Sequence, residues 1–207
     1  MQIAILLYPG FTATDAIGPY EVLSRLPGAR TVFVAATPGP VTSDTGFLQV
    51  LAEPLSAAPA PAVVVAPGGP TARVPTGDVV VLDWLRAADR TSTWTTSVCT
   101  GALLLGAAGL LRGRKASTHW EDRDLLATHG ATAVDARYVF DGKVVTAAGV
   151  SAGFDMALAL AARIAGDRVA QAIQLGIEYD PQPPFDAGSP RTAPPEVLAL
   201  VRSRARP

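Results

Sequence analysis

The chain is organised around the stretch TTSVCTGALLLG, residues 95–106. A β-prone run ends abruptly at Cys99, the only cysteine, and an apolar helix pattern follows without a linker. The pattern predicts a tight strand-to-helix turn in which the thiol faces the start of a helix. Because a helix N-terminus stabilises negative charge, we expect the turn to favour the thiolate. Gly101 leaves room for the backbone to turn and for a substrate to approach.

Apolar runs alternate with amphipathic patterns along the rest of the sequence. Apolar runs predict strands at residues 3–8, 31–36 and 62–66, and the β-prone residues 93–98 predict the strand that leads into Cys99. A β excursion is expected in 37–51 and a short strand at 115–118. Helical patterns cover residues 19–26, 78–89, 101–111, 119–126, 151–166, 169–178 and 195–204. A hairpin is predicted at 138–146, with Asp141-Gly142 in a type I′ turn, and Ser151 is the expected N-cap of the helix that follows. We therefore expect one α/β domain over residues 1–207, with a doubly wound, mostly parallel, flavodoxin-like sheet.

Composition excludes several classes of protein. The chain carries 17 basic and 18 acidic side chains, a net charge of −1, which favours neither nucleic acid nor an anionic membrane as a partner. One cysteine forms no internal disulfide, which fits a reducing compartment. The N-terminal apolar run lacks a basic region and a cleavage site, and no apolar stretch reaches the roughly 20 residues that span a bilayer. The expectation is a soluble cytoplasmic protein.

Asp15 is the first candidate partner of Cys99. It follows the first strand and precedes Pro19, which fits best at the first position of a helix. The first strand and the cysteine strand end at the same edge of the sheet, where open α/β sheets place their chemistry. A protonated Asp15 could donate a hydrogen bond to the thiolate and shuttle a proton. The alternative is a helix-start cap with no chemical role.

Two further segments reach the same edge. Gly68-Gly69 directly follows a strand and could expose backbone N–H groups to a ligand or oxyanion, or form no more than a tight turn. His119 follows a short strand and is either a site residue, a hydrogen-bonded neighbour or exposed. Two histidines and one cysteine form no recognisable ligand set, so no metal is expected. Without a glycine-rich phosphate fingerprint, no nucleotide cofactor is indicated. A lone cysteine is itself commonly a small buried hydrophobe.

The C-terminal part of the chain changes character. Residues 180–190 are rich in proline and predict a fixed, extended loop before a last helix. We expect residues 180–207 to form an ordered loop and helix that packs on a partner or on its own subunit.

Four segments together resemble the DJ-1/PfpI superfamily. They are DAIGP at 15–19, APGG at 66–69, SVCTG at 97–101 and THW at 118–120. The match covers nearly the whole chain. Within the superfamily, the motifs TSVCTG, GAAGLL, THW and PPFDAGSP are most similar to the isocyanide hydratases.

The resemblance implies a cofactor-free homodimer that hydrates an isocyanide to an N-substituted formamide. It implies that Cys99 attacks the terminal isocyanide carbon to form a thioimidate and that Asp15 passes protons. Thr100 would contribute its backbone N–H, with its hydroxyl as a second candidate group, and Gly69, with Gly68, would face the developing charge. His119 and Val150 complete the expected oxyanion and substrate-binding set. Pro70 departs from the family pattern because it has no N–H, which leaves the Gly69 N–H as the expected donor.

Two other functions stay open at this stage. Peptidase members of the superfamily carry His directly after the cysteine, whereas this chain has Thr100, which argues against a Cys-His dyad. A different cysteine enzyme of the superfamily, glyoxalase-, deglycase- or amidase-like, is the first alternative. The second is a non-catalytic small-molecule sensor, the role of similar domains in transcription regulators.

Overall fold

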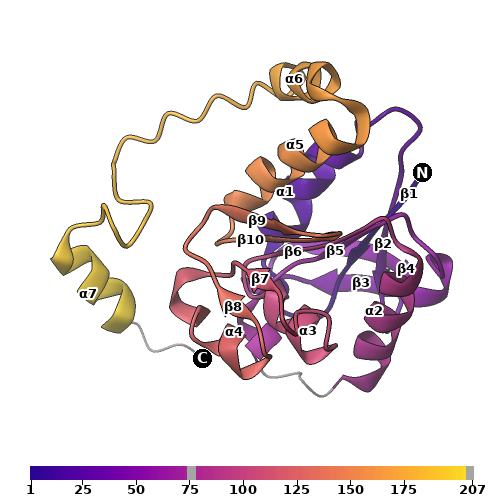
Figure 1. Cartoon of the computed structure of the whole chain (residues 1–207), viewed down its shortest axis with the longest axis horizontal. Coiled ribbons are helices and arrows are strands. Elements are labelled where there is room, and N and C mark those ends of the chain that lie inside the picture. The colour runs from indigo at the N-terminus through magenta and orange to yellow at the C-terminus, as the bar shows by residue number, and fades with distance from the viewer. Residues whose placement is uncertain (74–77, 204–207) are drawn as a thin grey trace.

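The structure is a computed structural model that describes residues 1–73 and 78–203. An eight-stranded sheet forms the centre of this part of the chain, and helices cover both faces (Figure 1). The strand order is β3-β4-β2-β1-β5-β6-β10-β9. The six inner strands run parallel, and the edge strands β3 and β9 are antiparallel to their neighbours. The predicted doubly wound, mostly parallel sheet is confirmed.

The elements follow the predicted alternation. The strands of the main sheet are β1 (Gln2–Leu6), β2 (Arg30–Ala35), β3 (Gly39–Thr42), β4 (Gln49–Pro54), β5 (Val63–Ala66), β6 (Trp94–Val98), β9 (Tyr138–Asp141) and β10 (Val144–Ala147). A separate pair joins β7 (Lys115–Ala116) to β8 (Thr132–Ala133). The helices are α1 (Ala13–Leu23), α2 (Val79–Thr91), α3 (Gly101–Ala107), α4 (Leu125–Thr128), α5 (Ala152–Ala165), α6 (Asp167–Gly176) and α7 (Pro195–Ser203), with 3-10 turns η1 (Leu55–Ala57), η2 (Pro70–Arg73) and η3 (Trp120–Asp122).

Two hydrophobic cores lie on opposite faces of the sheet. Successive residues of a strand point to opposite faces, so Ile3 and Ile5 of β1 enter one core and Ala4 and Leu6 enter the other. The first core is covered by α1, α5 and α6, and the second by α2, α3 and α4. Burial on both faces explains why the inner strands are continuous apolar runs.

Helix α1 starts earlier than the sequence predicted. It begins at Ala13, so Asp15 lies in its first turn and Pro19 lies inside the helix rather than at its start. Close packing against α5 explains the difference: a Cβ at Gly18 would lie 3.0 Å from the Phe154 ring, and one at Gly153 would lie 3.3 Å from Pro19 Cδ. Tertiary packing here outweighs the cost of an internal proline.

Three local predictions hold only in part: the hairpin is present and Ser151 is the N-cap position of α5, but the details differ. Residues 119–126 form η3 and part of α4 rather than one helix. In the hairpin, Asp141 pairs with Val144, so the loop is Gly142-Lys143; only Gly142 has a positive φ, whereas a type I′ turn needs two. Ser151 precedes α5, but its hydroxyl accepts a hydrogen bond from Arg137 and caps no helix N–H.

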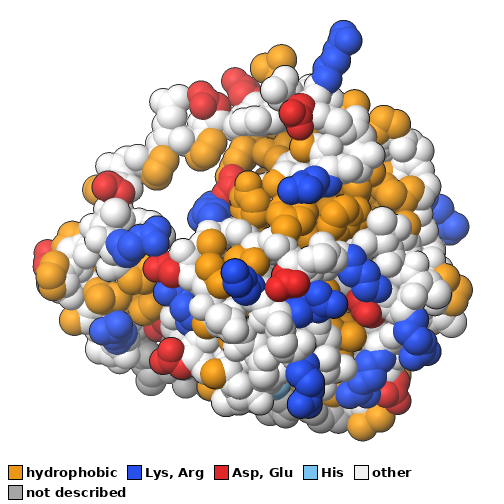
Figure 2. Space-filling model, viewed as in Figure 1, with side chains coloured by type: hydrophobic (Ala, Val, Ile, Leu, Met, Phe, Trp, Pro, Cys, Tyr) orange, Lys and Arg blue, Asp and Glu red, His pale blue; other side chains and the backbone are white. Residues whose placement is uncertain are grey.

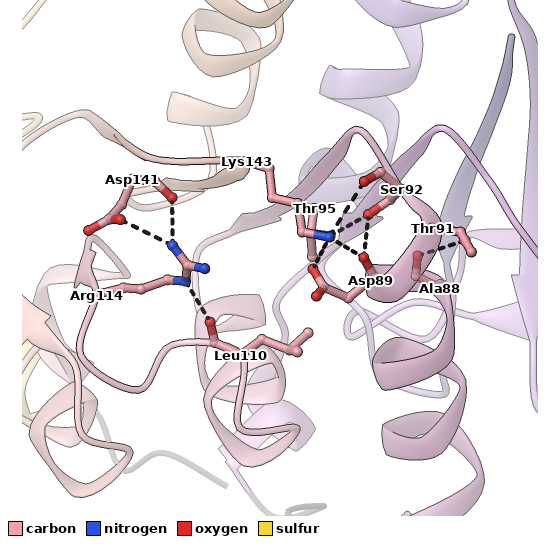
Figure 3. A network of polar contacts seen from close by, with 9 residues as sticks. All are labelled: Ala88, Asp89, Thr91, Ser92, Thr95, Leu110, Arg114, Asp141 and Lys143. Atoms are coloured by element: carbon pink, nitrogen blue, oxygen red, sulfur yellow. Dashed lines mark hydrogen bonds and ion pairs between the residues drawn. The ribbon is translucent and has the colours of Figure 1, made fainter.

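A polar network fixes the amino-terminal end of β6, away from Cys99 (Figure 3). Asp89 at the end of α2 accepts a hydrogen bond from Thr95 Oγ1 at 2.7 Å, and Lys143 Nζ lies 3.4 Å from the Asp89 carboxylate. On edge strand β9, Asp141 pairs with Arg114 of the loop before β7 at 3.2 Å. These contacts tie the start of β6 and the β9–β10 loop to α2, and β9 to the loop before β7.

The C-terminal segment leaves the body after α6 and returns to it. Figure 1 shows residues 177–194 arching away from α5 before α7, and Figure 2 shows open space between this segment and the body. Phe185 in the arch is 77% exposed. At the far end Arg191 pairs with Asp135 at 3.1 Å, and the Arg202 guanidinium lies 5.8 Å from the Trp120 ring centre.

Candidate active site

Cys99 lies at the turn between β6 and α3 in a left-handed backbone conformation. Its φ is +56°, which costs a non-glycine residue about 1–3 kcal/mol. Its N–H is donated to the Ala148 carbonyl at 2.9 Å, and Thr118 Oγ1 donates to its carbonyl at 2.8 Å. Gly101 makes the turn possible, because a Cβ there would lie 2.1 Å from the Ala66 oxygen. The predicted elbow is therefore present, held by contacts from three segments.

Asp15 lies beside this elbow with its carboxyl fully buried. Its Oδ2 accepts the Gly68 N–H at 2.9 Å, and its Oδ1 has no hydrogen-bond partner. Burial raises the pKa of Asp15 from 3.8 to about 7, and the nearby Asp44 charge adds to the effect. The Gly68 N–H and the Cys99 thiol lower the pKa in part. Asp15 therefore exchanges its proton near neutral pH, as a proton shuttle requires.

The expectation that the helix start favours the thiolate was wrong. Burial, followed by the Asp15 charge, raises the pKa of Cys99 to about 12, although the backbone N–H groups of Val150 and Thr100 lower it in part. Helix α3 has seven residues, and its dipole does not offset the loss of water around a side chain that is 6% exposed. At neutral pH the cysteine is a thiol beside an acid that titrates first.

The Gly68-Gly69 loop holds the site together instead of facing a ligand. The Gly68 N–H binds Asp15, and the Gly69 N–H is donated to Thr100 Oγ1 at 2.9 Å. The Thr100 hydroxyl in turn donates to the Gly69 carbonyl at 3.0 Å. The predicted role of the Gly69 N–H as an anion donor is therefore wrong, because side chains of the protein already occupy it.

Gly68 has to be glycine at this position. A Cβ would lie 2.6 Å from both the backbone nitrogen and Oγ1 of Thr100, and 2.8 Å from Asp15 Oδ2. These distances are too short for any side chain. The absence of a Cβ thus lets the loop, the acid and the elbow meet.

Val150 and His119 form the other wall. Val150 has a φ of +22°, and its N–H favours the Cys99 thiolate. His119 packs against the loop that carries Gly149 and Val150, since a Cβ at Gly149 would lie 2.8 Å from the His119 ring. Its Nδ1 accepts the Glu121 N–H at 3.4 Å and lies 3.8 Å from Asp122 Oδ2.

Sequence reasoning missed Tyr8 and Asp44. Tyr8 donates from its hydroxyl to the Pro67 carbonyl at 2.9 Å; burial, followed by the Asp15 and Cys99 charges, raises its pKa well above 10. Asp44 accepts a hydrogen bond from Thr12 at 2.7 Å. Tyr8 directly follows the first strand, which was a usable signal. Asp44 sits in a hairpin loop that nothing in the sequence ties to the site.

Within its described residues the structure contains neither a cluster of metal-ligating side chains nor a membrane-spanning helix. Within 1–73 and 78–203, no group of three or more His, Cys, Asp or Glu side chains could hold a metal ion. No helix in the same ranges is long and apolar enough to cross a membrane.

Comparison with known proteins identifies the family. The model of the DJ-1/PfpI family matches residues 1–163. The chain belongs to the DJ-1/PfpI family. Among family relatives, the isonitrile hydratase of Pseudomonas putida is 44% identical over 207 residues, which is 100% of this chain and 91% of the relative.

Two other similar proteins are informative. A THiJ/PfpI family protein from Pseudomonas syringae has a crystal structure with a TM-score of 0.92 and 41% identity, covering 97% of this chain and 84% of that one. The HTH-type transcriptional regulator CdhR of Pseudomonas aeruginosa is 31% identical over 175 residues, 80% of this chain but 51% of the regulator. The likeness to the first protein extends past residue 163, where the family model stops.

Proposed function

We propose that this chain is an isocyanide hydratase, a lyase that adds water to an isocyanide to give an N-substituted formamide through a Cys99 thioimidate. The full-length likeness to an isonitrile hydratase supports the reaction. The observation that carries the proposal is the Asp15–Cys99 pair, a buried thiol on a strained turn beside a carboxyl whose pKa is about 7.

In the first step the sulfur attacks the terminal carbon of the isocyanide. The Asp15 carboxylate takes the thiol proton as the C–S bond forms, and the same proton then passes to that carbon. The balance is R–NC plus HS–Cys99 giving R–N=CH–S–Cys99. Because Cys99 is a thiol at neutral pH, the reaction needs a neighbouring base, and a carboxyl that titrates near 7 serves as both base and acid.

In the second step water adds to the thioimidate carbon. Asp15 accepts a proton from the water, and protons pass to the nitrogen and to the departing sulfur. The C–S bond breaks, which gives R–NH–CHO and regenerates HS–Cys99. The N–H groups of Thr100 and Val150 face the sulfur and stabilise its negative charge as it leaves. The Thr100 hydroxyl is a positioning group, because it is bonded to Gly69.

The proposal includes a single-domain cytoplasmic enzyme that works without a cofactor as a homodimer. The dimer is supported by the arch at residues 177–194, which carries an exposed Phe185. Hydrophobic side chains also gather over α1 and α5 beside this opening in Figure 2. On these two helices, Tyr20, Phe154 and Leu158 are only partly buried. Light scattering at working concentration should give twice the chain mass; a monomer would contradict the dimer.

The test is an assay of purified protein with a simple alkyl or aryl isocyanide, alongside methylglyoxal and a peptidase substrate. We expect formamide from the wild type and none from Cys99→Ala, with circular dichroism showing that the variant is folded. Turnover of methylglyoxal or peptide without isocyanide hydration would favour another cysteine enzyme of the family. No turnover of any of the three would favour a sensor.

A further inference from the structure

A cavity of about 330 Å³ is bordered by His119 and Val150, which also border the site. We call it the roofed pocket. Its floor is made by residues 119, 120, 123, 135–137 and 148–151 of the body, and its roof by residues 188–191 of the C-terminal segment. The floor belongs to the active site, since the Val150 N–H faces the Cys99 sulfur and His119 packs against Gly149.

Ion pairs connect the roof of the pocket to its floor. Asp135 bridges the two sides, with Arg123 of the floor at 2.8 Å and Arg191 of the roof at 3.1 Å. The roof lies beyond residue 163, where the family match ends, yet within the stretch shared with the isonitrile hydratase. An element that covers the site and is outside the general family match is placed to determine specificity rather than basic chemistry.

The walls carry more positive than negative charge. Three guanidinium groups line the pocket, from Arg123, Arg137 and Arg191. Asp135, the one carboxylate among the lining residues, is shared by Arg123 and Arg191, while Arg137 pairs with Asp155.

We propose that the roofed pocket binds the substituent of the isocyanide and selects substituents that carry a carboxylate. The inference rests on the proposed hydratase activity, because it assigns the substituent of that substrate. A guanidinium fork matches a carboxylate in charge and geometry. Trp120 and Pro190 contribute apolar surface to the wall.

Binding of product-like ligands tests the pocket apart from catalysis. N-formylglycine and its uncharged amide are titrated into the wild type, Arg191→Gln and the matched control Arg25→Gln by calorimetry at low ionic strength. Arg25 pairs with Glu21 on the surface and takes no part in the pocket. We expect the wild type and the control to prefer the carboxylate by about tenfold, and Arg191→Gln to lose most of that preference.

Equal binding of the acid and the amide by the wild type would overturn the pocket assignment, as would an equal loss in Arg25→Gln. Turnover gives the matching readout: kcat/KM for isocyanoacetate over its methyl ester should exceed one and fall in Arg191→Gln. The two proposals fail separately. Hydration of the ester without carboxylate preference removes the pocket alone, whereas carboxylate binding with no hydration of either substrate removes the hydratase alone.

Discussion

Asp15→Asn should make the Cys99 thiol more acidic while it slows hydration. The Asp15 charge is one of the causes that raise the pKa of Cys99, so its removal stabilises the thiolate. The same substitution removes the group that accepts and returns the proton. A more reactive thiol in a less active enzyme is an unusual combination, and it follows directly from the pairing.

The size of the change follows from the charge. Two unit charges about 4 Å apart at an effective dielectric constant of about 20 interact by about 4 kcal/mol, an upper limit of roughly three pKa units. We therefore expect the pKa of Cys99 to fall from about 12 by about one to three units. Each unit raises the thiolate fraction about tenfold at any pH below the new pKa.

Alkylation by iodoacetamide measures this change, because the chain has one cysteine and every adduct reports on Cys99. Rates between pH 7 and 10 should be at least about tenfold faster in Asp15→Asn than in the wild type. Asp44→Asn is the matched control, because the Asp44 charge raises the pKa of Asp15 but does not act on the pKa of Cys99. Its alkylation rate should therefore stay near that of the wild type. An Asp15→Asn thiol that alkylates no faster than the wild type would refute the reasoning.

Three further outcomes follow from the same geometry. Burial raises the pKa of Asp15 from 3.8 to about 7, so between these pH values the folded protein holds the Asp15 proton more tightly than the unfolded chain does. The contribution of Asp15 to the free energy of unfolding therefore falls as the pH rises from about 4 to about 7, by about 4 kcal/mol at most. Asp15→Asn should accordingly gain Tm relative to the wild type between pH 5 and pH 8 in calorimetry, and a constant difference would contradict the linkage. Gly68→Ala should lose more than about 100-fold in kcat/KM and about 2–3 kcal/mol in stability by urea titration, because its Cβ would lie 2.6 Å from Thr100. The control Gly176→Ala, which has open space around the new Cβ, should change neither quantity appreciably. Thr100→Val should cost about 1–3 kcal/mol by leaving the Gly69 N–H unpaired, while the Gly69 carbonyl keeps the Ala72 N–H. Thr100→Ser should restore most of the loss, and equal losses in both variants would point to packing instead.

Much of the fold could be predicted from local pattern. The buried strands around Ile3 and Val63 are recognisable because parallel strands covered on both faces need continuous apolar runs, and the strand before Cys99 by its β-prone residues. The start of α1 was misplaced because Pro19 was weighed as a local signal, while the packing of Gly18 on Phe154 is a tertiary contact that no local pattern shows. The sequence predicted that an element exists wherever its pattern was long. It did not predict the ends of an element where tertiary packing determines them.

The candidate site shows the same limit. That Cys99 and Asp15 meet followed from strand ends sharing one edge. Their pKa values did not follow, because the helix start is visible in the sequence and the degree of burial is not. The Gly69 N–H was taken for a ligand donor, since the sequence cannot show that the Thr100 hydroxyl folds back onto it.

Intact-mass spectrometry of acid-quenched enzyme tests the central claim most directly. Because the thiol proton is retained on the isocyanide carbon, mixing wild-type protein with an isocyanide should add the full mass of one isocyanide molecule. Fragmentation should place the addition on Cys99, and Cys99→Ala should show neither the addition nor formamide. Formamide production by Cys99→Ala, or an addition found elsewhere in the chain, would contradict covalent catalysis by this cysteine.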